Sequence, residues 1–168
     1  MGYLRALAQL TGRVDEAMAA EERFRATLAN AVARSRETGR AERTVVLMYG
    51  SAESIGVDTS DSLKGDLLAQ LFRYPFPAKG SDAATASTFS VEELLAQQPD
   101  VALVYSLLFS ADDRTLSAQL ADHPVWQLVP AVQQGQVHEV DARLWGSGRG
   151  TRSLTAIVEQ AMALVPAP

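Results

Sequence analysis

Hydrophobic residues near the N-terminus recur at the spacing of one helix face. From Val14 onward the apolar positions lie three, four or seven residues apart and include Ala17, Phe24 and Leu28. No glycine or proline interrupts residues 13–38. The pattern predicts helix over residues 3–37, with a break near Gly12. A helix of about 25 residues extends roughly 37 Å, which is longer than one small lobe needs, so it is a structural spine or an arm between two lobes.

Short apolar runs alternate with helical patterns along the rest of the chain. The runs predict strands at residues 44–49, 101–105 and 137–140, and the helical patterns lie at 62–72, 90–98, 112–121 and 151–164. Residues 123–130 contain two prolines, Pro124 and Pro130, and predict single helical turns at most. Residues 50–60 and 73–88 are predicted to be loops, the second with room for one short strand. This alternation predicts an α/β fold: a single three-layer lobe with a mostly parallel, Rossmann-like sheet.

The segment 89–109 combines a capped helix, a buried strand and an apolar loop. Ser90 and Glu93 have the spacing of a capping box, and Pro99 ends the helix because proline has no N–H to donate. The apolar run at 101–105 is typical of a strand covered on both faces of a parallel sheet. Three large apolar residues follow it: Leu107, Leu108 and Phe109. These side chains either cover the next helix or contact a ligand, and the sequence leaves both readings open.

Composition excludes several classes of function. The chain has 168 residues, enough for one domain with a real core, and its net charge of −5 argues against a nucleic-acid-binding surface. It contains no cysteine, so disulfides and thiol chemistry are excluded. No run approaches the eighteen or so apolar residues of a membrane span. Met1 leads directly into helical sequence, and we expect no export signal in this chain.

Aromatic and cationic residues follow the predicted parallel strands. The carboxyl ends of such strands meet at one edge of the sheet, where ligands bind in open α/β folds. The candidate ligand-binding residues at this edge are Tyr49, Glu53, Tyr105, Phe109, Arg143, Trp145 and Arg149. Aromatic faces and guanidinium groups together favour a bulky, flat or anionic ligand, although the tyrosines are equally well explained as strand ends. Trp145 is followed closely by Gly146 and Gly148, and we expect it in an exposed loop in contact with a ligand or partner.

Support for catalysis or metal binding is thin. The two histidines are scattered, no nucleophile elbow or zinc motif is present, and no close pair of carboxylates stands in a setting that suits catalysis. We therefore predict no catalytic residue and no metal site. The stretch Gly146–Gly150 opens a helix and could hold an anion, but it fits neither the dinucleotide fingerprint nor a P-loop. The alternative hypothesis is a small flavodoxin-like enzyme or nucleotide-binding domain that uses this stretch, although a flexible turn explains it as well.

Two stretches carry a family resemblance. The first runs from Ser90 through Glu92, Glu93, Pro99 and Asp100, and the second covers residues 121–141 with its Pro-Val-Trp-Gln, Pro-Ala-Val and Gly-Gln-Val elements. Together with the long first helix, they resemble the C-terminal lobe of the iron-siderophore, haem and cobalamin substrate-binding proteins of bacterial ABC importers. The resemblance covers nearly the whole chain. In these proteins two α/β lobes are joined by one rigid helix.

The resemblance implies a domain division and a function. Residues 1–38 would be the interlobe helix and residues 39–168 the C-terminal ligand-binding lobe, with the N-terminal lobe absent from this chain. The ligand would be a ferric siderophore or related iron chelate, with haem and cobalamin as alternatives, and no cofactor is implied. Glu92 matches the position of a glutamate that docks on the permease dimer. The full-length protein would be periplasmic, or extracellular and membrane-anchored through a lipid. A third hypothesis is an interaction domain that keeps this fold without the site.

Overall fold

A five-stranded sheet forms the centre of the computed structural model, which describes residues 2–76, 87–108, 110 and 112–168. Its strands are β1 (Val45–Ser51), β2 (Ser54–Val57), β3 (Ser87–Phe89), β4 (Val101–Ser106) and β5 (Val137–Glu139), in the spatial order β3-β2-β1-β4-β5. β1, β4 and β5 are parallel, and β2 is antiparallel to both of its neighbours. Four of these five strands therefore run in one direction, and the predicted mostly parallel α/β sheet is confirmed.

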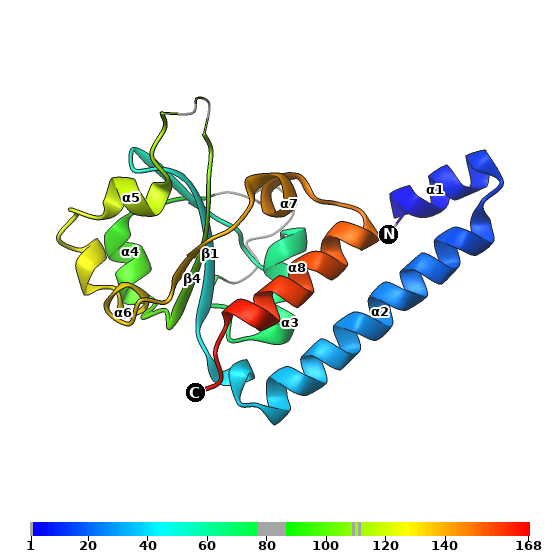
Figure 1. The fold of residues 1–168 in the computed structure, drawn as a ribbon, viewed down its shortest axis with the longest axis horizontal. Coiled ribbons are helices and arrows are strands. Elements are labelled where there is room, and N and C mark those ends of the chain that lie inside the picture. The colour runs from blue at the N-terminus through cyan, green and yellow to red at the C-terminus, as the bar shows by residue number, and fades with distance from the viewer. Residues whose placement is uncertain (1, 77–86, 109, 111) are drawn as a thin grey trace.

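Helices cover both faces of the sheet (Figure 1). One face packs against α2 (Val14–Glu37), α3 (Leu63–Leu71) and α8 (Thr151–Leu164), and its core includes Leu47 and Leu103. The other face packs against α4 (Val91–Ala96), α5 (Leu116–Leu120), the 3-10 turn η2 (Trp126–Leu128) and α6 (Pro130–Gln133), and its core includes Met48 and Val104. The alternation of neighbouring residues between two cores is the period-2 geometry of strands, which explains why β1 and β4 are apolar at every position.

The N-terminal helical pattern forms two helices. α1 (Gly2–Thr11) ends at the predicted break, and α2 continues as one uninterrupted helix of 24 residues. Gly12 has φ +68°, a conformation that glycine adopts at no steric cost, so α1 turns back beside α2 (Figure 1). α2 ends near Gly39, after which η1 (Arg40–Glu42) leads into β1. The N-terminal 37 residues are thus an elbow of two helices, and α1 does not extend the line of α2.

The remaining elements test the other predictions. α8 occupies the predicted residues, and the capping box of α4 is present: Glu93 N donates to Ser90 Oγ at 3.1 Å, and Ser90 N donates to Glu93 Oε2 at 2.9 Å. The predicted loop at 50–60 is wrong, because it contains β2, which forms a hairpin with β1. The helix predicted at 112–121 is shorter and begins only after Thr115, which caps it. The loop predicted around Trp145 is also wrong, because this residue lies in α7 (Ala142–Ser147).

Candidate ligand-binding site

Most of the predicted ligand-binding residues lie at the carboxyl edge of the parallel strands. Tyr49 and Tyr105 are direct partners near the ends of β1 and β4, Arg143 is in α7 after β5, and Arg149 lies between α7 and α8. Glu53 is exposed in the turn between β1 and β2. Phe109 lies outside the described residues. The topology therefore gathers these groups as predicted, although their exposures differ.

Tyr49 and Tyr105 form a stacked pair on the sheet face that carries α3 and α8. Their ring centroids are 5.1 Å apart and their planes differ by 11°. The Tyr49 ring lies against Gly56 of β2, where an added Cβ would stand 2.5 Å from the ring. Burial raises the pKa of both phenols, with a smaller contribution from the charge of Asp58. Tyr105 is 7% exposed and Tyr49 is half-buried, so Tyr49 offers the larger surface to a ligand.

Trp145 is part of the core, and the prediction that it stands in an exposed loop is wrong. Its side chain has 0% exposure, and its Nε1 donates to Gln160 Oε1 at 2.6 Å. The residue lies in α7, which Asp141 caps by accepting a hydrogen bond from Leu144 N at 2.8 Å. Asp141 is a preferred N-cap residue and could have signalled the start of a helix in the sequence. Gly146 and Gly148 favoured a loop instead. In this arrangement the indole has no surface for a ligand to touch.

An open recess lies beside the ends of β4 and β5. It has a volume of about 620 Å³ and is lined by Ser106, Leu107, Leu108, Thr115, Glu139, Val140, Asp141, Ala142, Arg143 and Ser147. Leu107 and Leu108 are each 49% exposed, so they do not serve mainly to cover the next helix. Apolar side chains, the exposed Leu107 and Leu108 among them, thus share one concave surface with the guanidinium group of Arg143. This combination is typical of a site for a partly apolar anion.

The carboxylates of this recess are already engaged. Glu139 accepts hydrogen bonds from Ser106 Oγ at 3.1 Å, from Ser117 N at 3.1 Å and from Ser117 Oγ at 2.6 Å. Ser106 Oγ in turn accepts a hydrogen bond from Leu116 N at 2.6 Å, so the two side chains together hold the start of α5. Asp141 caps α7, so Glu139 and Asp141 each accept a hydrogen bond from a backbone N–H at the start of a helix. Arg143 and Arg149 form no ion pair with any carboxylate in the described part of the chain.

Two buried ionisable residues near this edge escaped the sequence analysis. Asp58 is 5% and Lys64 is 4% exposed; Lys64 Nζ donates to Gly146 O at 2.9 Å. Asp58 Oδ2 has no hydrogen-bond partner among the described residues. Burial raises the pKa of Asp58 and lowers that of Lys64, while their mutual attraction acts the other way. No sequence signal distinguishes Lys64, because a lysine in the first turn of a helix normally faces solvent.

Glu92 is exposed in the first turn of α4. β3 pairs with β2 next to the end of β1, so α4 begins at the carboxyl edge of the sheet. Because β3 and β5 are the outer strands, Glu92 lies on the same edge as the recess but toward its opposite end. Ser90 and Glu93 complete the capping box, and Glu92 makes no hydrogen bond or ion pair to another described residue.

Comparison with known proteins identifies the family. Residues 3–144 match the family model described as "Periplasmic binding protein". The chain belongs to this family. Its members bind solutes and are not enzymes, in agreement with the prediction of a non-enzymatic binding protein, and the resemblance drawn from the sequence is confirmed at the level of the family. The alternative of a nucleotide-binding enzyme depended on a glycine-rich loop at Gly146–Gly150. The structure does not have this loop as predicted, because Gly146 is part of α7.

Individual relatives show how similar they are to this chain and how much of each protein the similarity covers. The Fe(3+)-citrate-binding protein YfmC of Bacillus subtilis (strain 168) is 30% identical over 112 residues, which are 66% of this chain and 33% of that protein. The fold matches an ABC transporter substrate-binding protein of Listeria monocytogenes EGD-e with TM-score 0.79 and 16% identity, over 98% of this chain and 62% of that one. The haem complex of S. aureus IsdE gives TM-score 0.79, 15% identity and the same coverages. A siderophore periplasmic binding protein of Thermobifida fusca gives 0.73 and 20%, over 95% and 57%.

This periplasmic binding protein chain therefore spans a third of the curated relative and about three fifths of the solved ones. Within its described residues, no group of three or more histidines and carboxylates could hold a metal ion. No helix of that part is long and apolar enough to cross a membrane.

Proposed function

We propose that this periplasmic binding protein chain is a ligand-binding lobe of an ABC importer's solute-binding protein, and that it binds a ferric siderophore or related iron chelate. The ligand would lie against the carboxyl edge of the sheet, over the 620 Å³ recess and the exposed side of Tyr49. Residues 39–168 would form this lobe, and α2 would be the helix that connects it to a second lobe. The 30% identity to a Fe(3+)-citrate-binding protein supports this class of ligand.

The charged side chains at the carboxyl edge of the sheet are the main support for an anionic iron chelate as the ligand. The two acids that line the recess, Glu139 and Asp141, accept hydrogen bonds from backbone N–H groups, whereas Arg143 and Arg149 form no ion pair with a described carboxylate. The positive charge of Arg149 opposes the rise in the pKa of the buried Asp58. Guanidinium groups pair with carboxylate, phenolate and similar anionic oxygens through charge-assisted hydrogen bonds. Leu107 and Leu108 add apolar contact area. Such a surface favours an iron chelate that presents anionic oxygens on one side and an apolar face on the other.

Calorimetric titration tests this proposal. We expect ferric citrate or a ferric siderophore to bind, and Arg143→Ala combined with Arg149→Ala to weaken the affinity at least about tenfold, because a hydrogen bond to a charged group contributes roughly 1.5–3 kcal/mol. Arg36→Ala, an exposed arginine at the far end of α2, is the matched control and should leave the affinity unchanged. Equal affinity in the double variant and the control would contradict the role of the two arginines.

Permease docking through Glu92 is a separate part of the proposal. Its support is an exposed carboxylate at the carboxyl edge, outside the capping box that its neighbour Glu93 completes. In cells that depend on this importer, Glu92→Ala should reduce uptake of radioactive iron chelate while the purified protein keeps its affinity for the chelate. Glu159→Ala, an exposed glutamate on α8, controls for a general charge effect. Normal uptake by the Glu92 variant would remove the docking role.

A further inference from the structure

Lys64 is a buried cation that joins two helices far apart in the sequence. Its side chain belongs to the first turn of α3 and is 4% exposed, and its Nζ donates to Gly146 O at 2.9 Å. Gly146 lies near the end of α7, where the last carbonyl groups of a helix lack partners within the helix. A lysine ammonium satisfies such a carbonyl well. Lys64 therefore caps the end of α7 from a different helix.

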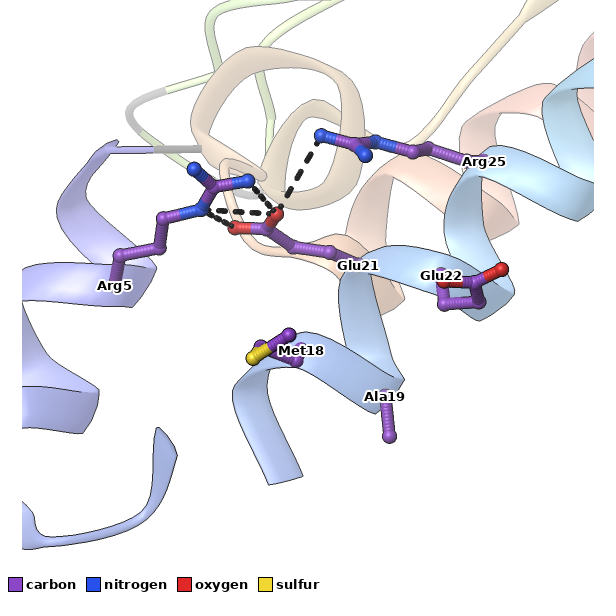
Figure 2. Close-up of a pocket in the computed structure, with 6 residues that line it drawn as sticks. All are labelled: Arg5, Met18, Ala19, Glu21, Glu22 and Arg25. Carbon is purple, nitrogen blue, oxygen red and sulfur yellow. Dashed lines mark hydrogen bonds and ion pairs between the residues drawn. The ribbon is translucent and has the colours of Figure 1, made fainter. Parts of the chain in front are cut away.

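The buried Glu21 shows how this chain neutralises a buried charge directly. Arg5 Nη2 lies 2.7 Å from Glu21 Oε2, and Arg25 reaches the same carboxylate at 3.6 Å (Figure 2). Lys64, in contrast, forms no ion pair with a carboxylate of the described chain. A methionine would fill the same space without the cost of burying a charge. Packing alone therefore does not explain a lysine at this position.

Asp58 balances the charge of Lys64 without touching it. This aspartate follows β2 and is 5% exposed, and Tyr74 Oη donates to its backbone carbonyl oxygen at 2.6 Å. Burial lowers the pKa of Lys64 and the charge of Arg149 lowers it further, whereas the charge of Asp58 raises it. Within the described chain, Asp58 and Arg149 are the charged groups that shift this pKa. The carboxylate thus favours the protonated form of the ammonium.

The peptide group that Lys64 holds adjoins two residues of the proposed ligand site. A Cβ at Gly146 would stand 3.4 Å from the Tyr105 ring, so the end of α7 lies against that ring. Arg149 belongs to residues 148–150, the short connection between α7 and α8. α3, α7 and α8 share one core on the same face of the sheet (Figure 1). A shift of Gly146 would therefore displace both the Arg149 backbone and the surroundings of Tyr105.

We propose that Lys64 is a positioning residue of the ligand site: its ammonium fixes the end of α7, and thereby places Arg149 and Tyr105 at the carboxyl edge. The inference rests on the proposed function, because Arg149 is one of the residues proposed to bind the chelate. Lys64 is buried and acts through these two residues. This role needs both a hydrogen-bond donor and a positive charge, and Asp58 supports it by keeping Lys64 charged.

Substitutions at position 64 separate positioning from packing. Lys64→Met keeps the length and the apolar stem but removes the donor, whereas Lys64→Arg keeps donor and charge. We expect Lys64→Met to weaken ferric citrate binding at least about threefold in calorimetric titration. The amides of residues 147–150 should exchange at least about fivefold faster with solvent hydrogen in the same variant. Lys64→Arg should restore most of both losses. Gln70→Met, at an exposed position of α3, is the matched control and should change neither.

The pH dependence of the Gly146 carbonyl gives a readout that a packing role would not move. Its carbon-13 signal should shift as Lys64 loses its proton, at a lower pH than for an exposed lysine, because burial lowers the pKa of Lys64. Asp58→Asn removes the attraction that raises this pKa, so the shift should move to still lower pH. In Lys64→Arg the signal should stay constant over this range, because a guanidinium group keeps its charge.

Three results would overturn the proposal. The first is unchanged exchange of residues 147–150 in Lys64→Met. The second is a Gly146 signal whose pH dependence Asp58→Asn leaves unaltered, and this test stands even where Lys64→Met does not fold. The third is faster exchange in Lys64→Met without any loss of affinity for ferric citrate. Exchange and the carbonyl signal are measured without chelate. A parent chain that binds no iron chelate would therefore contradict the proposed function, while these two readouts still decide whether Lys64 fixes the end of α7.

Discussion

The sheet with its flanking helices and the α1–α2 elbow place their side chains in opposite ways. In the body around the sheet, Trp145, Leu47 and Leu103 are fully buried and the charged groups lie outside or at the carboxyl edge. In the elbow, a carboxylate is enclosed by arginines while leucines with up to 84% exposure face solvent. The body therefore buries its apolar residues within itself, whereas the elbow presents four large ones, Leu7, Leu10, Val14 and Met18, to solvent.

Truncating the indole of Trp145 should give the largest effect. Trp145→Ala leaves a cavity in the body and removes the hydrogen bond to Gln160, so we expect a loss of about 3–5 kcal/mol and a fall in Tm of about 10 °C. Leu10→Ala in the elbow should change the free energy of unfolding by less than about 0.5 kcal/mol. Thermal and urea unfolding of both variants measure the two losses of stability. Equal losses would contradict the difference in burial between the body and the elbow.

A methyl group added at Gly56 should give an intermediate effect. Its Cβ would stand 2.5 Å from the Tyr49 ring, so Gly56→Ala must move that ring and disturb the stack with Tyr105. We expect a loss of about 1–3 kcal/mol and an altered near-UV circular dichroism spectrum. Gly150→Ala is the control, because its Cβ meets nothing within 4 Å and Gly150 has φ −82°. An unchanged spectrum in the Gly56 variant would show that the stack does not depend on this close approach.

Neutralising Glu21 should give the smallest effect, confined to the elbow. The folded-state pKa of Glu21 is lowered, chiefly by Arg5, so its stabilisation is present at neutral pH and is lost as the pH falls through that lowered pKa. Glu21→Gln should unfold at lower urea than the wild type at pH 7, and the difference should vanish toward pH 3. The exposed neighbour Glu22, also visible in Figure 2, gives the control variant Glu22→Gln. A pH-independent difference would mean that packing, not charge, holds α1.

The regular part of the fold was predictable from the sequence. The apolar runs gave β1, β4 and β5, and the periodicity gave α2 and α8 with the break at Gly12, because strand and helix periods dominate long segments. The hairpin partner β2 has only four residues, Ser54–Val57, and carries Gly56 at its centre, which resembles loop sequence. It is a strand because β1 offers it a backbone ladder, and that pairing is a tertiary effect.

The candidate site was predictable in position but not in detail. Topology alone brings Tyr49, Tyr105, Arg143 and Arg149 to one edge, as expected for parallel strands. The burial of Trp145 depends on the packing of α7 against α8, and no local sequence pattern indicates that contact. The buried Lys64 depends in the same way on a carbonyl 82 residues away, at Gly146. Contacts at such sequence distances escape an analysis based on spacing.

Nuclear magnetic resonance with a paramagnetic iron chelate tests whether the ligand binds at the carboxyl edge of the sheet. Ferric iron broadens amide signals near it, whereas gallium in the same chelate does not, so the pair of titrations locates the metal even when binding is weak. With ferric citrate, we expect broadening along the carboxyl edge and none at the opposite end of the sheet, near Val45 and Val101. The signals that should broaden are those of Tyr49, Leu107, Arg143 and Arg149. Broadening centred on the elbow, at Leu10 and Met18, or none with any iron chelate, would contradict binding at this edge.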